Sequence, residues 1–174
     1  MKKLKNKPSE LSYEGFIEVF RDVYEHSSWV AEAAWEFVQR ADQKVFFDDI
    51  DAMANLLKEV VNNSRYERKL ALLNAHPDLA GKAALSGSLT ADSANEQAGA
   101  GLDSCTKDEL ARFHQLNTCY KQKNGFPFIM AVKGATKHQV LQGFDSRIKH
   151  DTDQEFLCAV SEVHKIAMFR LEDK

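Results

Sequence analysis

Residues 74–97 read NAHPDLAGKAALSGSLTADSANEQ, and the fold of the chain depends on how this stretch interrupts its helices. Proline directly after His76 disfavours helical geometry at that histidine, so we expect the preceding helix to end near Ala75. Two turns that contain glycine follow, and then a Glu96-Gln97 pair at the predicted start of a helix. The stretch therefore predicts an imidazole at a helix break, followed by a helix that carries a carboxylate and an amide.

The sequence before residue 64 has the periodicity of amphipathic helices, in which apolar residues recur at i, i+3, i+4 and i+7. Ser28 is expected to cap the second of these helices, and the Asp48-Asp49 pair suits the positive end of the third. The three predicted buried faces are Phe16, Val19, Phe20 and Val23, then Val30, Ala33, Ala34, Phe37, Val38 and Ala41, then Ile50, Met53, Ala54, Leu57, Val60 and Val61.

Five later patterns have the spacing of a capping box, in which a Ser or Thr precedes a Glu or Gln by three residues. The box at Ser64 predicts a helix that ends near Ala75, and Pro77 is suited to the first position of a short helix through Leu79. The other four boxes begin at Ser93, Thr106, Thr136 and Thr152 and predict helices near 93–101, 107–123, 137–149 and 153–171. Asn124-Gly125 is a suitable end for the second of these four helices.

One apolar run is not helical, and it reads FPFIMAV over residues 126–132. It is short, contains proline and has no second run to pair with, so we interpret it as an extended segment between helices. The sequence thus predicts one all-α domain of about eight helices over residues 1–174. Residues 1–11, which carry four lysines, are expected to form a flexible basic N-terminus.

Composition excludes several classes of protein. The net charge of -3 and the lack of a basic block interleaved with aromatic residues argue against nucleic-acid binding. No apolar run reaches the roughly 20 residues of a spanning helix, so no membrane association is expected. Three dispersed cysteines, no signal-peptide pattern and no SKL-type ending favour a cytoplasmic protein.

His76 is the first candidate for chemistry, although a lone histidine is more often structural than catalytic. Its position at a helix break lets the ring face a cavity, and an imidazole suits proton transfer near neutral pH. The other five histidines have no such setting and are expected on the surface or on helix faces. They are His26, His114, His138, His150 and His164.

Glu96 and Ser93 each have a local alternative, since both positions belong to a capping box that stabilises a helix by about 1 kcal/mol. Gln97 lies about 100° further round the helix, so one pocket can contact both Glu96 and Gln97 only from the helix start. A helix N-terminus is also a natural site for an anionic ligand. Ser93 is therefore a cap, a ligand contact, or both.

Arg170 continues the predicted buried face of the last helix, formed by Phe156, Val160, Val163 and Ala167. An unpaired buried charge is costly, so Arg170 either extends off the helix end or meets a carboxylate inside, such as that of a substrate. Arg147 is a candidate for a similar supporting role, with a solvated position as the favoured alternative.

Patterns for several other chemistries are missing from the sequence. There is no Walker A loop, no GxSxG nucleophile elbow, no HExxH motif and no common zinc spacing. Dependence on a metal is therefore not expected.

Four blocks, HPDLAGKAAL, LTADSANEQAGAGL, NGFPFIMAV and IAMFRL, together resemble the OHCU decarboxylase family over residues 12–171. OHCU is 2-oxo-4-hydroxy-4-carboxy-5-ureidoimidazoline. The resemblance implies an all-helical, homodimeric enzyme without a cofactor that releases CO2 from OHCU and leaves (S)-allantoin, at the last step from urate. Residues 133–135 depart mildly from the common family pattern.

The resemblance also implies which residues act. The catalytic residues are His76, Glu96 and Arg170, and the substrate contacts are Pro77, Ser93, Ala94, Asn95, Gln97, Phe128, Ile129, Met130, Ala131 and Val132. Two alternatives from other classes are a helical ligand-binding protein of the same fold without catalysis, and a metal-dependent hydrolase.

Overall fold

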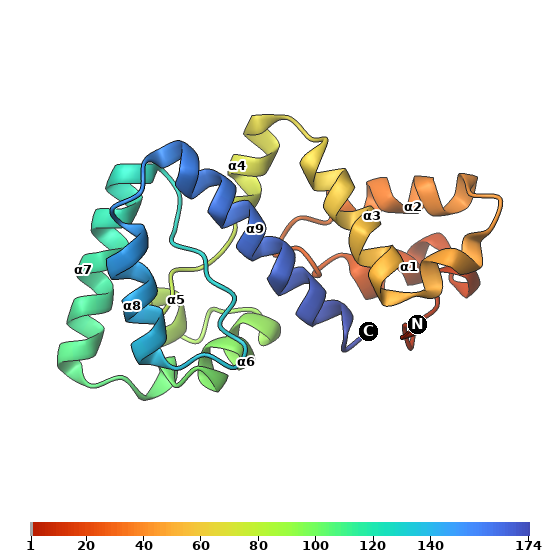
Figure 1. The fold of residues 1–174 in the computed structure, drawn as a ribbon. Coiled ribbons are helices and arrows are strands. Elements are labelled where there is room, and N and C mark those ends of the chain that lie inside the picture. The colour runs from red at the N-terminus through yellow and green to blue at the C-terminus, as the bar shows by residue number, and fades with distance from the viewer. Residues whose placement is uncertain (1) are drawn as a thin grey trace. The chain divides into compact units, whose positions relative to one another are not determined.

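The computed structural model describes residues 2–174 apart from the side chain of Leu85, and all its regular structure is helical (Figure 1). One isolated bridge joins Lys3 to Asp49. No helix in this described part is both long and apolar enough to cross a membrane. The prediction of an all-α fold is confirmed. The α-helices are α1 (Tyr13–Phe20), α2 (Trp29–Arg40), α3 (Ile50–Asn62), α4 (Tyr66–Asn74), α5 (Lys82–Leu85), α6 (Ala91–Gly99), α7 (Lys107–Asn124), α8 (Lys137–Arg147) and α9 (Thr152–Leu171), and the short 3-10 helices are Pro8–Glu10, Lys44–Asp48 and Leu102–Ser104.

The chain divides into two compact units. Unit 1 comprises residues 1–75 and 164–174, and unit 2 comprises residues 76–163. Helix α9 supplies its first part to unit 2 and its last part to unit 1. That residues 1–174 form one domain stays a prediction.

The core of unit 1 is built mainly on the apolar faces of α1 to α4. Phe16 and Phe20 of α1 are buried as predicted, and the ring of Trp35 in α2 lies 5.2 Å from that of Phe16. Phe37 was predicted in the buried face of α2, but it is 59% exposed. Ala31 is buried instead, so the buried face of α2 is rotated away from Phe37.

The basic N-terminal segment, which we expected to be flexible, makes specific contacts within unit 1. Leu4 is buried and donates its backbone N–H to the carbonyl of Asp48 at 2.8 Å. Asn6 donates its backbone N–H to the carbonyl of Lys174 at 2.9 Å. Burial of an apolar side chain and these backbone hydrogen bonds hold a segment whose lysines alone favour solvent.

The predicted capping boxes divide into correct and wrong ones. Those at Thr106 and Thr136 are confirmed, with both reciprocal hydrogen bonds present. The other three, at Ser64, Ser93 and Thr152, are wrong. Their helices follow the cap residues Arg65, Thr90 and Asp151 instead, and Asp151 accepts a hydrogen bond from the backbone N–H of Gln154 at 2.8 Å. Ser28 occupies the predicted cap position of α2, but its side chain makes no capping hydrogen bond.

Helix ends in unit 2 follow the sequence closely, with two exceptions. Helix α7 ends at Asn124, and Gly125 follows with a φ of 80°, as predicted. Helix α8 ends at Arg147, two residues before the predicted end, and the short helix expected at Pro77 is absent, because α5 begins only at Lys82.

Residues 126–132 lie in neither a helix nor a strand, as predicted, and they lead from the end of α7 towards the start of α8 (Figure 1). Aromatic side chains fasten this segment to the helices. The ring of Phe128 stacks on that of Phe144 in α8 with centroids 3.8 Å apart, and Tyr120 of α7 contacts both edge-on. The core of unit 2 therefore fixes an irregular stretch of backbone between its helices.

His164 was expected on the surface or on a helix face, and it lies half-buried on α9 within unit 1. The phenol of Tyr24 lies 2.8 Å from its Nδ1, and the side-chain oxygen of Asn62 lies 3.0 Å from its Nε2. A neutral ring that donates from Nε2 to Asn62 and accepts at Nδ1 from Tyr24 satisfies both contacts. Burial, together with the charges of Lys58 and Lys69, lowers the pKa of His164 to about 4.

We predict that Thr106→Ala lowers the free energy of unfolding by about 1 kcal/mol, because it removes the side-chain half of a capping box. The matched change Thr152→Ala leaves Asp151 as the cap of α9 and should alter stability by less than about 0.5 kcal/mol. Urea unfolding of both variants measures the difference. Equal losses in the two variants would contradict this assignment of helix starts.

We also predict that the protein loses stability as the pH falls from about 6.5 towards 4. The unfolded histidine, with an ordinary pKa of 6.5, binds a proton in this range, whereas folded His164, with its pKa lowered to about 4, does not. Stability from the neutral ring is therefore complete above pH 6.5 and decreases below it. In His164→Gln the difference in unfolding free energy between pH 7.5 and pH 5 should be smaller than in the wild type.

Candidate active site

His76 lies at the predicted helix break. Helix α4 ends at Asn74, Ala75 is its C-cap, and His76 follows outside any helix with 8% of its surface exposed. The break is confirmed, and the imidazole is buried at the first position of unit 2.

The loop after His76 contains a tight turn. Ala80 has a φ of 48°, which residues other than glycine rarely adopt. At Gly81 a Cβ atom would lie 2.5 Å from the Cβ of Asp78, so only glycine fits. The backbone after His76 is thus held in an unusual conformation that the surrounding structure must stabilise.

Side chains of α6 and α7 stabilise this loop. Gln97 of α6 accepts a hydrogen bond from the backbone N–H of Ala80 at 3.0 Å. Asn117 of α7 donates to the carbonyl of Leu79 at 2.9 Å, and Lys121 pairs with Asp78 at 2.7 Å. Gln97, predicted as a substrate contact, therefore has a structural contact in the loop that follows His76.

The sequence analysis did not identify Asn117 or Lys121. One signal was present, since Asn117 lies four residues after Phe113 and three before Tyr120, on the buried face of α7. A buried amide among apolar neighbours requires a polar partner. The sequence does not show that this partner is the loop carbonyl of Leu79, 38 residues earlier.

Ser93, Glu96 and Gln97 share one face of α6, because they are spaced at i, i+3 and i+4. Ser93 and Gln97 are buried and Glu96 is half-buried, whereas Ala94 and Asn95 are exposed. Since α6 begins at Ala91, Glu96 lies inside the helix and not at its start. The capping role that we considered for Glu96 is therefore wrong, and helix capping does not explain why a carboxylate lies at this position.

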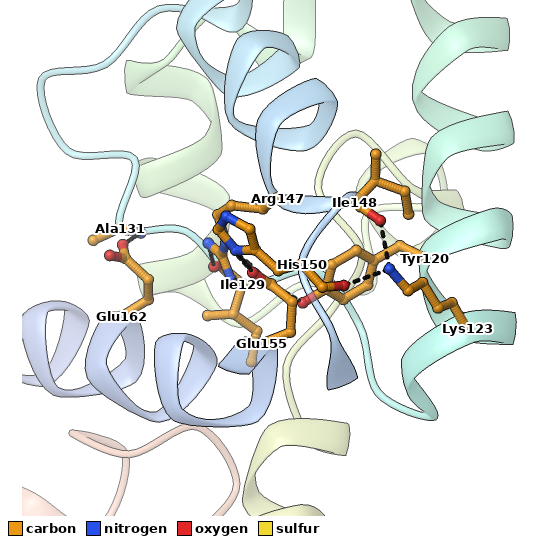
Figure 2. Close-up of polar contacts among 9 residues, drawn as sticks. All are labelled: Tyr120, Lys123, Ile129, Ala131, Arg147, Ile148, His150, Glu155 and Glu162. Atoms are coloured by element: carbon orange, nitrogen blue, oxygen red, sulfur yellow. Dashed lines mark hydrogen bonds and ion pairs between the residues drawn. The ribbon is translucent and has the colours of Figure 1, made fainter. Parts of the chain in front are cut away.

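The segment 128–132 is largely buried, with Met130 and Ala131 half-exposed. The carbonyl of Ile129 accepts a hydrogen bond from Nη1 of Arg147 at 2.7 Å, and the N–H of Ala131 donates to Oε2 of Glu162 at 2.8 Å. Two backbone groups of this segment are thus bonded to side chains of helices (Figure 2).

Arg147 belongs to a buried polar cluster and is not the solvated residue that we favoured. Its Nη2 lies 2.9 Å from Oε2 of Glu155, which is fully buried. Glu155 also contacts the phenol of Tyr120, and its Oε1 lies 2.7 Å from Nδ1 of His150 (Figure 2). Burial alone would raise the pKa of Glu155, but hydrogen bonds from Arg147 and Tyr120 lower it overall. The carboxylate is therefore ionised, and its bonds to Arg147, Tyr120 and His150 explain why Glu155 does not cap α9.

Arg170 lies in unit 1 and is 4% exposed. Its Nη1 is 2.6 Å from Oε2 of Glu25 and 3.2 Å from the carbonyl of Asp22. Of the two positions that we considered, Arg170 occupies the buried one, and the carboxylate that it meets is that of the chain itself. The sequence analysis did not identify Glu25, which follows the last turn of α1 and belongs to no helix.

Metal-ligating side chains do not cluster in the described part of the chain. No three His, Cys, Asp or Glu residues there could hold a metal ion together. Cys105, Cys119 and Cys158 are free thiols.

The fold and these side chains define an all-α protein with a buried imidazole on a constrained loop and a carboxylate on a neighbouring helix face, a set suited to acid–base chemistry on a small molecule. Residues 9–172 match the family model described as OHCU decarboxylase. The chain therefore belongs to the OHCU decarboxylase family.

Individual relatives agree with this assignment. The chain is 36% identical over 166 residues to the 2-oxo-4-hydroxy-4-carboxy-5-ureidoimidazoline decarboxylase of Haloferax volcanii, covering 95% of this chain and 92% of the relative. The protein of the same name from Halalkalicoccus jeotgali is 38% identical, with 92% and 85% covered.

Solved structures show the same likeness. A structure described as (S)-allantoin synthase is similar with a TM-score of 0.73 at 36% identity, over 94% of this chain and 51% of that one. An OHCU decarboxylase structure determined in the presence of (S)-allantoin has a TM-score of 0.68 at 20% identity. The match covers 88% of this chain and 94% of that one, and it supports the fold alone.

We predict that Gln97→Ala lowers the free energy of unfolding by about 1–3 kcal/mol, because the buried N–H of Ala80 loses its acceptor. Asn95→Ala, an exposed amide on the same helix, is the matched control. Urea unfolding that gives the same value for Gln97→Ala and Asn95→Ala would contradict the contact.

Proposed function

We propose that this protein decarboxylates OHCU to (S)-allantoin and CO2 without a cofactor, as the last step from urate to allantoin. The observation that carries the proposal is the family match over residues 9–172, together with relatives that carry the name of this activity over nearly their whole length. The buried imidazole of His76 at a constrained helix break supplies the proton carrier that such a reaction needs.

The structure of OHCU makes a reaction without a cofactor reasonable. Its carboxyl and hydroxyl groups are both attached to carbon 4. The neighbouring carbon 5 is joined to a ring nitrogen by a C=N double bond. When the bond between carbon 4 and the carboxylate breaks, its electron pair forms a double bond between carbons 4 and 5, and the electrons of the C=N bond move to the ring nitrogen, which takes up a proton. The resulting enol then loses its hydroxyl proton as carbon 5 gains one. Protonation on one face of carbon 5 gives a single enantiomer of allantoin.

We propose that His76 carries this proton, since imidazole is the side chain whose unperturbed pKa suits both giving and receiving a proton near neutral pH. Glu96 either fixes the protonation state of His76 or holds the hydroxyl group of the substrate. Its position inside α6 supports such a role, because the helix cap is made by Thr90 and needs no carboxylate from Glu96.

Arg170 is the third proposed catalytic residue, on the basis of the family resemblance. An arginine that gripped the leaving carboxylate would stabilise the ground state and oppose catalysis, so contact with a ring or ureido oxygen is favoured. The pairing of Arg170 with Glu25 supports this choice, because a carboxylate of the chain already balances the charge of the guanidinium.

The remaining proposed contacts extend over two stretches of unit 2. Ser93 and Gln97 are buried, which supports them as substrate contacts more than Ala94 and Asn95, whose side chains are exposed. We also propose that the protein is a homodimer and acts in the cytoplasm. The full set of proposed substrate contacts is Pro77, Ser93, Ala94, Asn95, Gln97, Phe128, Ile129, Met130, Ala131 and Val132.

We predict that the wild type accelerates formation of optically active allantoin and that His76→Ala does not. OHCU is generated freshly from urate with urate oxidase and hydroxyisourate hydrolase, and allantoin is followed by circular dichroism. Loss of one acid–base group should slow the reaction by about 100-fold or more.

The matched control is His138→Ala, which removes an exposed histidine of α8 and should keep wild-type activity. If the wild type and His76→Ala both gave the same slow racemic product, the protein would be a ligand-binding member of the fold without this activity. Unchanged activity in the presence of a chelator would exclude a metal-dependent hydrolase.

A further inference from the structure

The segment 126–132 presents a problem for an all-helical unit. Its backbone belongs to no helix or strand, yet Phe126, Phe128 and Val132 are buried. Buried N–H and C=O groups need partners, and there is no neighbouring strand in the described part of unit 2 to supply them. Side chains from helices must therefore replace a strand.

Two side chains from different helices do so at adjacent points. Arg147 of α8 donates to the carbonyl of Ile129 at 2.7 Å, and Glu162 of α9 accepts from the N–H of Ala131 at 2.8 Å (Figure 2). In an extended backbone, residues two apart present their polar groups to the same edge. Arg147 and Glu162 thus act on one edge of the segment.

Arg147 is itself held in place on several sides. Glu155 of α9 binds its Nε and Nη2 atoms at 3.1 Å and 2.9 Å, and its guanidinium carbon lies 4.4 Å from the ring centre of Phe128. Glu155 also receives hydrogen bonds from Tyr120 and Arg147 that keep its charge in place. A planar guanidinium fixed in this way holds the carbonyl of Ile129 at a defined position.

The opposite edge of the segment is different. Within the described residues, no hydrogen bond of the chain reaches the backbone N–H or C=O of Met130, which lies between the two bonded residues. Met130 is half-exposed, so a ligand can approach its backbone. The side chains of α8 and α9 therefore bond to the backbone of Ile129 and Ala131, whereas the backbone of Met130 between them receives no such bond.

We propose that Arg147 and Glu162 are positioning residues that hold the backbone of Ile129 and Ala131 in place. The backbone of Met130 is then presented to the substrate at one fixed position. Glu155 acts through Arg147. This inference rests on the proposed function, which includes residues 128–132 among the substrate contacts. It adds two charged residues that touch the segment, Arg147 and Glu162, and a third, Glu155, that holds Arg147.

The test compares Glu162→Ala with Glu162→Gln in the full chain. The alanine variant loses the acceptor for Ala131, and its kcat/KM for OHCU should fall about 10-fold or more, as expected for a lost hydrogen bond to a charged group. The glutamine variant keeps an oxygen at this position and should recover most of the loss. The thermal midpoint of the alanine variant should fall by about 2–10 °C, because the N–H of Ala131 loses its acceptor, and that of the glutamine variant should fall by less.

Asp153→Ala, which removes an exposed carboxylate of the same helix, is the matched control and should keep wild-type kinetics. Arg147→Lys keeps the charge but loses the planar fork, so it should lower kcat/KM and the enantiomeric excess of allantoin by more than Asp153→Ala does. The affinity of each variant for (S)-allantoin, measured by titration, provides a second readout.

The outcomes separate the two proposals. If the wild type is active and Glu162→Ala has the same kcat/KM, the positioning role is wrong and the proposed function stands. If Glu162→Ala loses activity only in proportion to lost folded protein, or if Glu162→Gln fails to recover it, the positioning role is also wrong. A wild type that neither turns over OHCU nor binds (S)-allantoin overturns both.

Discussion

The constraint on which unit 2 depends is that irregular backbone inside a helical unit must find hydrogen-bond partners without a sheet. Two stretches face this constraint, the loop of residues 76–81 and the segment 126–132. In each, side chains of neighbouring helices replace the missing strand: Gln97 and Asn117 in the first, Arg147 and Glu162 in the second. Each unsatisfied buried backbone group would cost about 1–3 kcal/mol, so these contacts matter more than the surface ion pairs.

The same constraint explains why the proposed site residues lie outside helices or on helix faces that meet loops. A regular helix uses its own N–H and C=O groups and has few left for a ligand. His76 and Met130 lie in irregular backbone, and Ser93, Glu96 and Gln97 share the face of α6 that meets the loop of Ala80. Neighbouring helices hold these irregular stretches in place, which fixes the positions of the proposed site residues.

Local chemistry determined which parts of this structure could be predicted from the sequence. Proline after His76 and glycine after Asn124 act on their own neighbours, and both helix ends are confirmed. The capping boxes at Thr106 and Thr136 are correct, and Glu109 keeps its hydrogen bond to the backbone N–H of Thr106 although it also pairs with Lys137. The box at Thr152 is wrong because Glu155 is drawn instead to Arg147, His150 and Tyr120, a contact that depends on tertiary packing.

The candidate site shows the same division. The break at His76 and the unpaired segment 126–132 follow from local rules, and both are confirmed. Local rules do not give the partners of the charged and amide groups, because these contacts join residues that are far apart in the sequence. Asn117 donates to the carbonyl of Leu79, 38 residues away, and Arg170 pairs with Glu25 from the other end of the chain. Periodicity places Arg147 and Arg170 near buried faces but contains no information about which carboxylate each will meet.

Both of these arginines are balanced by carboxylates of the chain, and this bears on how a decarboxylase can work. A substrate carboxylate that must leave as CO2 loses its charge during the reaction, so a strong cation beside it would be most favourable before the bond breaks and least favourable after. Arg147 is paired with Glu155 and Arg170 with Glu25, so neither presents an uncompensated charge to an anionic substrate. Paired guanidiniums retain their directed N–H groups, which suit neutral carbonyl oxygens. In the proposed mechanism, the pair with Glu25 leaves Arg170 with donors of fixed direction and limits stabilisation of the ground state.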